Sequence, residues 1–240
     1  MSIKPLKPRN GGKWYCHKKV IAHFPVGYTL YAEPFVGGGS IYFNTPHCET
    51  EVINDLDSTL INAYRCCKEE AFYIEAKTYT EEDYNQVKKE QPVTDRDKII
   101  REMKLARLSF FGIGNFTDHK KRNIVNEQVN KKFIQQHKRL QHTTICNKDY
   151  KEIITTYDSP STFFYLDPPY ENSNKTVQEY TDIDLEKLRD VVCTIKGKFL
   201  LSLNDSERTR ELFKDFHIDT ISTYYIRSKR YVNELIIKNY

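Results

Sequence analysis

The segment Asp167-Pro168-Pro169-Tyr170, directly after an apolar stretch, has residue types suited to one kind of chemistry. Two consecutive prolines fix φ and remove two backbone N–H donors, so the segment presents acceptors in a stiff geometry. Such a site favours an amine, because one N–H can donate to the Asp167 carboxylate and the other to the Pro168 carbonyl. Accepting both hydrogens pushes electron density onto the nitrogen, which favours its attack on a methyl sulfonium.

Tyr170 adds an aromatic ring to this acceptor site. The exocyclic N6 amine of adenine has the two hydrogens that the site can accept. A base flipped out of its stack could lie on the ring, a contact of about 1–3 kcal/mol per base. The alternative is an ordinary turn that begins at Asp-Pro and carries a surface tyrosine.

Gly37, Gly38 and Gly39 form a second candidate, between a predicted strand and a helix predicted to open at residues 41–43. Glycines let the backbone approach a ligand closely, and amides at a helix N-terminus favour a carboxylate or a phosphate. The segment lacks the Lys-Ser or Lys-Thr of a Walker loop and the G-x-G-x-x-G order of dinucleotide-binding proteins. A tight turn without a ligand is the alternative.

Asp55 follows the next predicted strand, where an acidic residue can accept hydrogen bonds from the two hydroxyls of a ribose. Its alternative role is a helix cap, although Asp57 or Ser58 can cap that helix instead. Ligands of open α/β sheets bind beyond the carboxyl ends of the strands. We therefore expect Asp55, the glycines and Asp167 to converge on one crevice.

The elements that must position these residues alternate between strands and helices. Strands are predicted at residues 28–33, 51–54, 143–146, 163–166, 199–203, 218–226 and 232–238. Helices are predicted near residues 14–24, from 58, at 149–154, at 185–195 and from 206. The last two strands fit an antiparallel pair at the end of a mostly parallel sheet, so the predicted fold class is α/β.

Residues 78–141 interrupt this alternation with helical patterns and no convincing buried strand. We predict a helical lobe over 59–146, inserted into a discontinuous catalytic domain over 1–58 and 147–240. Within residues 118–141, seven basic residues stand against two acidic ones, Asp118 and Glu127. The basic residues are Lys120, Lys121, Arg122, Lys131, Lys132, Lys138 and Arg139. Such a run is often only a solvated face.

Three segments together resemble the adenine-N6 DNA methyltransferases of the Dam family, the D12 class. They are residues 32–40 (AEPFVGGGS), Asn54-Asp55, and Asp167-Pro168-Pro169-Tyr170. Further similar segments are Gly11-Gly12-Lys13, Asp149-Tyr150 and Asn233-Glu234-Leu235-Ile236-Ile237, all in the family's order. The resemblance covers nearly the whole chain outside the lobe. It implies a Rossmann-like S-adenosylmethionine-dependent methyltransferase sheet with an inserted target-recognition lobe, and double-stranded DNA as the substrate.

The resemblance also implies roles for individual residues. Phe35, Gly37 and Gly39 would line the methionine part of S-adenosylmethionine, Asp55 would hold the ribose, and Tyr150 would lie beside the adenine. The cofactor-binding residues would be Lys13, Phe35, Gly37, Gly39, Ser40, Asp55, Tyr150 and Asp167. The catalytic residues would be Asp167, Pro168, Pro169 and Tyr170. Because a base-flipping enzyme must hold the surrounding duplex, Lys120, Lys121 and Arg122 would contact phosphates.

Some positions depart from the family's pattern. Arg9 stands where the family often has an aromatic residue in its first cofactor motif. Residues 107–116 resemble the recognition segment, which makes Arg107, Phe111 and Asn115 further DNA-binding candidates. Phe111 replaces the Asn, and Asn115 the Arg, of members that recognise GATC. Arginine is the usual partner of a guanine edge, so these departures weigh against GATC as the recognition sequence.

Composition excludes several other classes of protein. The chain has no apolar run near the roughly 18 residues that span a bilayer, and residues 1–9 lead into no signal peptide, so we expect a cytoplasmic protein. Six cysteines without a C-x-x-C pair predict reduced thiols and no metal site. The net charge of +4 permits nucleic-acid binding without requiring it.

Alternatives remain within and outside this chemistry. Cytosine N4 and an RNA adenine present the same kind of amine. Cytosine C5 methylation needs a nucleophilic cysteine, usually in a Pro-Cys pair, and the sequence has none. A DNA-binding module that has lost turnover is the rival of another class, and the intact Asp167, Asp55 and glycine segment argue against it. A cognate restriction endonuclease is a candidate partner.

Overall fold

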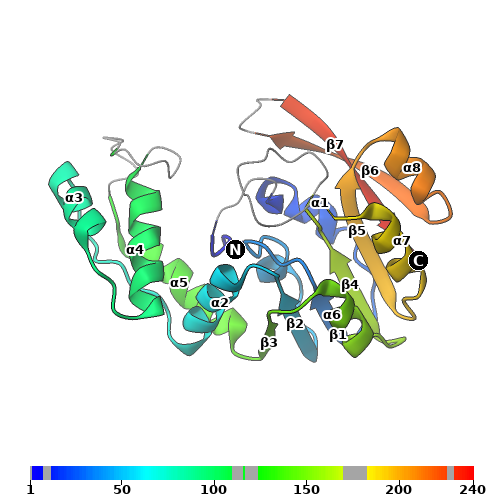
Figure 1. The fold of residues 1–240 in the computed structure, drawn as a ribbon, viewed down its shortest axis with the longest axis horizontal. Coiled ribbons are helices and arrows are strands. Elements are labelled where there is room, and N and C mark those ends of the chain that lie inside the picture. The colour runs from blue at the N-terminus through cyan, green and yellow to red at the C-terminus, as the bar shows by residue number, and fades with distance from the viewer. Residues whose placement is uncertain (1, 8–11, 110–115, 117–123, 170–182, 226–229) are drawn as a thin grey trace.

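A computed structural model describes residues 2–7, 12–109, 116, 124–169, 183–225 and 230–240. Its strands form one sheet in the order β3-β2-β1-β4-β5-β7-β6 (Figure 1). They are β1 (Leu30–Glu33), β2 (Thr50–Asn54), β3 (Thr143–Cys146), β4 (Thr162–Leu166), β5 (Lys198–Asn204), β6 (His217–Tyr225) and β7 (Arg230–Lys238). The first five strands are parallel, and β7 pairs antiparallel with both β5 and β6. The predicted fold class is confirmed.

The central strand β4 shows how the sheet is buried on both faces. Its residues are all buried, as expected for a parallel strand that is covered on each side. Because side chains alternate along a strand, Phe163 and Tyr165 enter one core cluster, while Phe164 and Leu166 enter the other.

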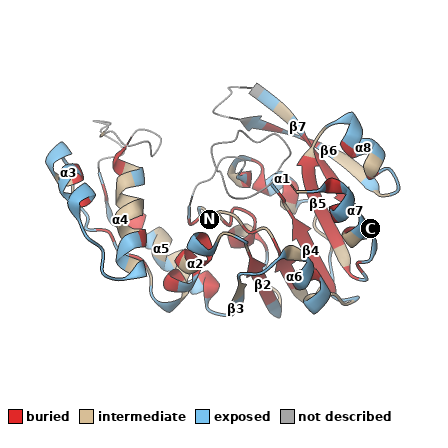
Figure 2. Ribbon diagram, in the orientation of Figure 1, coloured by how far each residue is buried: buried red, intermediate tan, exposed pale blue. Residues whose placement is uncertain are grey.

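Helices cover both faces of the sheet. The first cluster includes residues of α1 (His17–Ile21) and α2 (Ser58–Glu69), and the second includes residues of α6 (Tyr150–Tyr157) and α7 (Leu185–Cys193). Two shorter elements are η1 (Lys13–Tyr15) and α8 (Glu207–Leu212). The colouring of Figure 2 shows the sheet as the buried centre of the molecule.

Side chains that accept backbone N–H groups fix where the helices begin. Asp57 caps α2 by accepting from the Leu60 N–H at 3.1 Å, Asp149 caps α6, and Ser206 caps α8. The prediction that a helix opens at residues 41–43 is wrong. Only a three-residue 3₁₀ helix, η2 (Tyr42–Asn44), forms there. The chain becomes extended at Thr45 because a residue that precedes a proline, here Pro46, avoids the helical region.

The inserted region is helical, as predicted, with α3 (Glu81–Lys89), α4 (Asp95–Leu108) and α5 (Glu127–Leu140). In Figure 1, α3 and α4 lie at the end of the molecule away from β6 and β7. They share a small core of their own, formed by Ile74, Tyr79, Tyr84, Leu108, Val125 and Val129. The proposed domain boundaries stay a prediction, and β3, which they assign to the lobe, pairs with β2 in the sheet.

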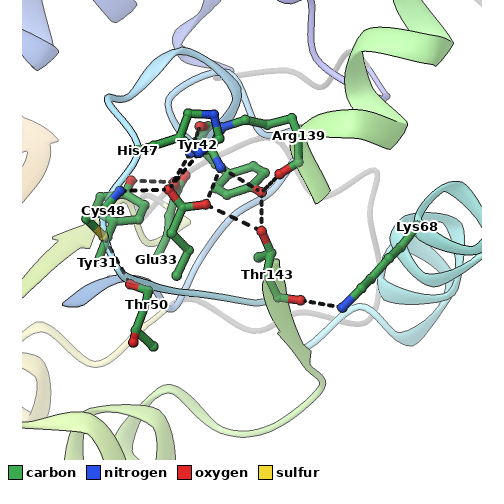
Figure 3. A network of polar contacts seen from close by, with 10 residues as sticks. Tyr31, Glu33, Tyr42, His47, Cys48, Thr50, Lys68, Arg139 and Thr143 are labelled. Carbon is green, nitrogen blue, oxygen red and sulfur yellow. Dashed lines mark hydrogen bonds and ion pairs between the residues drawn. The ribbon is translucent and has the colours of Figure 1, made fainter. Parts of the chain in front are cut away.

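A buried ion pair joins α5 to the sheet (Figure 3). The Arg139 guanidinium on α5 donates to both carboxylate oxygens of Glu51 on β2, and both side chains are 4% exposed. Tyr42 of η2 donates to the Arg139 carbonyl at 2.9 Å and also shares a short hydrogen bond with Thr143 of β3. Arg139 therefore adds nothing to the exposed basic surface, although the sequence count includes it.

Candidate functional site

Three neighbouring strands end at one edge of the sheet with the candidate residues directly after them. The order β2-β1-β4 places the segments that begin at Asp55, Pro34 and Asp167 side by side. This edge is where open α/β sheets bind their ligands. The sequence-predicted convergence of the three segments follows from this topology.

Asp55 fixes the glycine segment. One carboxylate oxygen accepts the Gly37 N–H at 2.9 Å, and the other accepts the Asp57 N–H at 3.0 Å. The Val36 N–H donates to the Asn54 carbonyl at 2.8 Å, which ties the same segment to the end of β2. A carboxylate has about four lone-pair positions, so it can accept several hydrogen bonds at once. The Gly37 amide, expected to face a ligand, is directed at Asp55 instead.

The glycines have distinct reasons to be glycine. Gly37 and Gly39 have φ of 49° and 79°, a backbone region that residues with a side chain rarely adopt. A Cβ at Gly39 would lie 2.6 Å from the Tyr64 hydroxyl, and Tyr64 itself donates to the Gly37 carbonyl at 2.9 Å. At Gly37 a Cβ would meet no described atom within 4 Å. Among the described residues, nothing blocks a ligand from the backbone there, which fits the methyl donor that the sequence implies.

Phe35 and Tyr150 pack against each other beyond β1 and β2. Their ring centroids are 5.1 Å apart at an interplanar angle of 34°. Burial, with the nearby Asp149 and Asp184 carboxylates, raises the pKa of Tyr150 to about 12, so its phenol is neutral. The pair presents an aromatic surface of the kind that a purine ring contacts.

Asn54 is a residue of this site that sequence reasoning did not assign a role. Its side-chain amide donates to the carbonyls of Pro34 and Lys148, each at 2.9 Å, and its oxygen accepts the Lys148 N–H at 2.8 Å. These bonds hold the segment bearing Phe35 against the start of α6, which bears Tyr150. A buried asparagine at a strand end is the signal that could have identified it.

Asp167 lies at the end of β4 with a lysine beside it. The Lys13 ammonium donates to Asp167 Oδ1 at 2.7 Å and lies 3.5 Å from Glu234 Oε2 on β7. Pro168 is buried and Pro169 exposed. The structure thus brings Lys13, predicted as a cofactor contact, to the candidate catalytic carboxylate. Tyr170 lies outside the described residues.

Glu33 is a second residue of the site that sequence reasoning passed over. It is the buried last residue of β1, and its carboxyl group accepts the Tyr31 hydroxyl at 2.6 Å. Burial raises its pKa well above the usual range, opposed by the Tyr31 hydrogen bond and reinforced by the charges of Asp167 and Asp55. An acidic residue ending an apolar strand is the signal that could have drawn attention to it.

Of the six DNA-binding candidates, the structure describes Arg107. It is half-buried near the end of α4 and donates to the Ile124 carbonyl at 2.7 Å. Burial and the positive charges of Lys4 and Arg107 lower the pKa of Lys132 on α5. The other candidates, and Arg9, lie outside the described residues: Phe111, Asn115, Lys120, Lys121 and Arg122.

Ser40 and the cysteines complete the predicted features. Ser40 is buried, and its carbonyl accepts the Asn44 side-chain amide at 2.9 Å. All six cysteines are free, as predicted, and burial raises the pKa of Cys67 to about 12. Among the described residues, no His, Cys, Asp and Glu side chains form a group of three or more that could hold a metal ion. Within the same part of the chain, no helix is long and apolar enough to cross a membrane.

Comparisons with known proteins agree with this geometry. The model of the D12 class N6 adenine-specific DNA methyltransferase family matches residues 10–226. The Type II methyltransferase M.CviBI of Paramecium bursaria Chlorella virus NC1A is 26% identical over 272 residues, covering 99% of this chain and all of that protein.

Two bacterial relatives are similar over most of their length. The Type II methyltransferase M1.LlaDCHI of Lactococcus lactis subsp. cremoris is 27% identical, covering 100% of this chain and 96% of that protein. A DNA adenine methylase of Vibrio cholerae serotype O1 is 26% identical, covering 88% of this chain and 85% of that protein.

Proposed function

Because the chain belongs to the D12 class of N6 adenine-specific DNA methyltransferases, we propose that it methylates N6 of an adenine flipped out of duplex DNA at a specific site. The observation that carries this proposal is the position of the Asp167 carboxylate, which accepts a hydrogen bond from the buried Lys13 ammonium at 2.7 Å. The next residue, Pro168, is buried and offers its carbonyl as a second acceptor. An acceptor pair at the end of a central strand suits an exocyclic amine.

The methyl donor would bind beside β1 and β2. S-adenosylmethionine supplies an electrophilic methyl group on a sulfonium. Asp55 would accept hydrogen bonds from the ribose hydroxyls, Tyr150 would lie beside the adenine ring, and Phe35, which packs against Tyr150, would line the methionine part. Gly37, Gly39 and Ser40 would line the methionine part together with Lys13. The space that the described residues leave beside Gly37 supports this placement.

Asp167 and Pro168 would hold the acceptor amine. The carboxylate accepts one N–H of N6 and the Pro168 carbonyl accepts the other, so the nitrogen is oriented and enriched in electron density. The Asp167 charge then stabilises the positive charge that N6 gains as it is alkylated. Pro169 keeps the segment stiff, and Tyr170 would stack on the flipped base.

The lobe would hold the duplex. Lys120, Lys121 and Arg122 would contact phosphates, while Arg107, Phe111 and Asn115 would lie near the bases to be read. The viral and lactococcal relatives are named Type II methyltransferases. A cognate restriction endonuclease is therefore a candidate partner of this chain.

The test is product identification. The full chain is incubated with labelled S-adenosylmethionine and duplex DNA, and the DNA is digested to nucleosides. We expect labelled N6-methyladenine, and we expect Asp167→Asn to lose activity by at least about 100-fold because it removes the charged acceptor.

Matched incubations with RNA, and a search of the digest for N4-methylcytosine, separate the alternatives. Glu207→Gln, a charge change of the same kind on the exposed start of α8, serves as the control for Asp167→Asn. N4-methylcytosine, methylated RNA alone, or no methylated nucleoside from the wild type would refute the proposal.

A further inference from the structure

Three charged side chains from distant parts of the sequence meet behind the candidate acceptor site. Lys13 of η1 lies 2.7 Å from Asp167 at the end of β4 and 3.5 Å from Glu234 of β7. The side chains of Lys13 and Glu234 are 2% and 1% exposed, and that of Asp167 is 19% exposed. A buried ammonium is costly unless carboxylates surround it, and here two of them share one cation.

Among the described residues, the other titratable groups near this cluster carry no opposing charge. Burial raises the pKa of the Cys16 thiol to about 11, with Glu234 and Asp167 raising it and Lys13 lowering it. The Glu33 carboxyl, from the end of β1, is shifted toward its neutral form by burial. The Thr223 hydroxyl of β6 contacts Cys16 and does not titrate. Within the described part of the chain, Lys13, Asp167 and Glu234 are therefore the charged groups of this cluster.

A catalytic carboxylate has two requirements that conflict. It must be held in one orientation, which a charged donor such as lysine achieves well. It must also stay a strong acceptor for the incoming amine, and a cation paired with it alone would weaken that capacity by withdrawing electron density. A second carboxylate that shares the cation meets both requirements.

We propose that Glu234 is a positioning residue for methyl transfer: by sharing the Lys13 ammonium, it lets Lys13 orient Asp167 without neutralising it. The inference rests on the proposed function, in which Asp167 accepts an N–H of adenine N6. Glu234 itself does not touch the substrate. It acts through Lys13, from a strand that lies two places from β4 in the sheet.

The methylation rate should fall at low pH, where Asp167 takes up a proton, and this fall is called the acid limb. Two substitutions should move the pH of the acid limb in opposite directions. Glu234→Gln keeps the shape but removes a negative charge, so Asp167 is ionised down to a lower pH and the limb moves down. Lys13→Gln removes the cation and leaves two carboxylates together, so Asp167 takes up a proton more readily and the limb moves up. If the two substitutions only impaired folding, they would not shift the acid limb in opposite directions.

The experiment measures single-turnover methylation of duplex DNA from about pH 4 to pH 9. For Glu234→Gln we expect a rate on the plateau about tenfold lower, because Asp167 becomes a weaker acceptor, with KM for S-adenosylmethionine within about twofold. The matched control is Glu51→Gln, a buried carboxylate on β2 outside the site. This control should lower stability and leave the acid limb in place.

A second readout needs neither DNA nor methyl donor. The ¹³C signal of the Asp167 carboxyl, identified by its loss in Asp167→Asn, is followed against pH in the full chain with labelled aspartate. We expect its midpoint to fall in Glu234→Gln and to rise in Lys13→Gln. An unchanged or raised midpoint in Glu234→Gln, or an activity loss that only tracks the unfolded fraction, would overturn the inference.

The two failures are distinguishable. If the wild type forms no N6-methyladenine, the proposed function fails whatever the NMR midpoint does. If the wild type forms it and Glu234→Gln shifts neither the acid limb nor the midpoint, only the role of Glu234 fails.

Discussion

Gly27 and Gly39 share a backbone conformation but not an environment. Both have φ of 79°, which is unfavourable for any other residue. A Cβ at Gly27 would meet no described atom within 4 Å, whereas at Gly39 it would press against Tyr64 and the Phe43 ring, at 2.6 and 2.8 Å. The two positions therefore separate backbone strain from steric conflict beside the site.

We expect Gly27→Ala to lower the free energy of unfolding by about 1 kcal/mol, the strain of a left-handed residue. Gly39→Ala should lower it by about 3 kcal/mol, because overpacking adds about 1–3 kcal/mol to the same strain. Urea denaturation gives both values. Calorimetry should show S-adenosylmethionine binding weakened at least about tenfold in Gly39→Ala alone. Equal effects of the two substitutions would contradict the packing argument.

The sequence predicts the residues that stand directly after strands and misses those whose role depends on a distant partner. Asp55, Gly37 and Asp167 can be proposed from the sequence because an apolar strand and a chemically distinctive segment lie close together along the chain. Asn54 gains its role through backbone groups of Pro34 and Lys148, and Glu234 through Lys13. Such pairings are set by strand order, which local patterns do not specify.

At the scale of elements, α5 is attached to the sheet by charge as well as by apolar contact. Arg139 and Glu51 are both buried, and their bidentate contact spans 88 residues of sequence. Removing one partner of such a pair leaves an uncompensated buried charge. The contact therefore couples the folding of the lobe's last helix to that of β2.

Arg139→Met should lower the free energy of unfolding by about 3–5 kcal/mol, the usual effect of breaking a buried pair. The double variant Arg139→Met with Glu51→Leu should recover much of that loss, because neither charge then remains buried. Thermal and urea unfolding of the two single variants and the double variant complete the cycle. Additive losses would show that the two side chains act independently.

Element boundaries depend on similar long-range effects. The strands at residues 163–166 and 199–203 are predicted well because they are apolar runs in the middle of the sheet, interrupted by Ser202 alone. The helix at residues 41–43 is not, because Thr45 precedes Pro46 and the Asn44 side chain bonds to the carbonyls of Ile3 and Ser40. Arg139 is counted as surface charge because its partner lies far earlier in the chain.

At the scale of the whole molecule, the predicted DNA contacts lie in the lobe and the chemistry lies at the sheet edge. Contacts to phosphates release counterions, so the logarithm of the binding constant falls with the logarithm of salt concentration by about 0.9 per contact. The slope therefore counts the contacts that hold the duplex. It is independent of the methylation rate.

Replacing Lys120, Lys121 and Arg122 by Ala should weaken duplex binding and reduce the magnitude of that slope by about 2–3. Fluorescence anisotropy at several salt concentrations measures it. The control replaces Lys187, Arg189 and Lys214 by Ala, the same loss of charge on and beside α7 and α8, at the far end of the molecule from α3 and α4 (Figure 1). An equal slope in the two triple variants would refute contacts by residues 120–122.

The position of β7 between β5 and β6 has a consequence for biosynthesis. Translation delivers β6 before β7, yet β6 reaches the sheet only through β7. Until residues 230–238 leave the ribosome, one edge of β5 stays unpaired and β6 has no strand to pair with. Unpaired strand edges promote aggregation. Slow decoding between β6 and β7 would prolong this stage and lower the yield of active protein, even though the amino-acid sequence is unchanged.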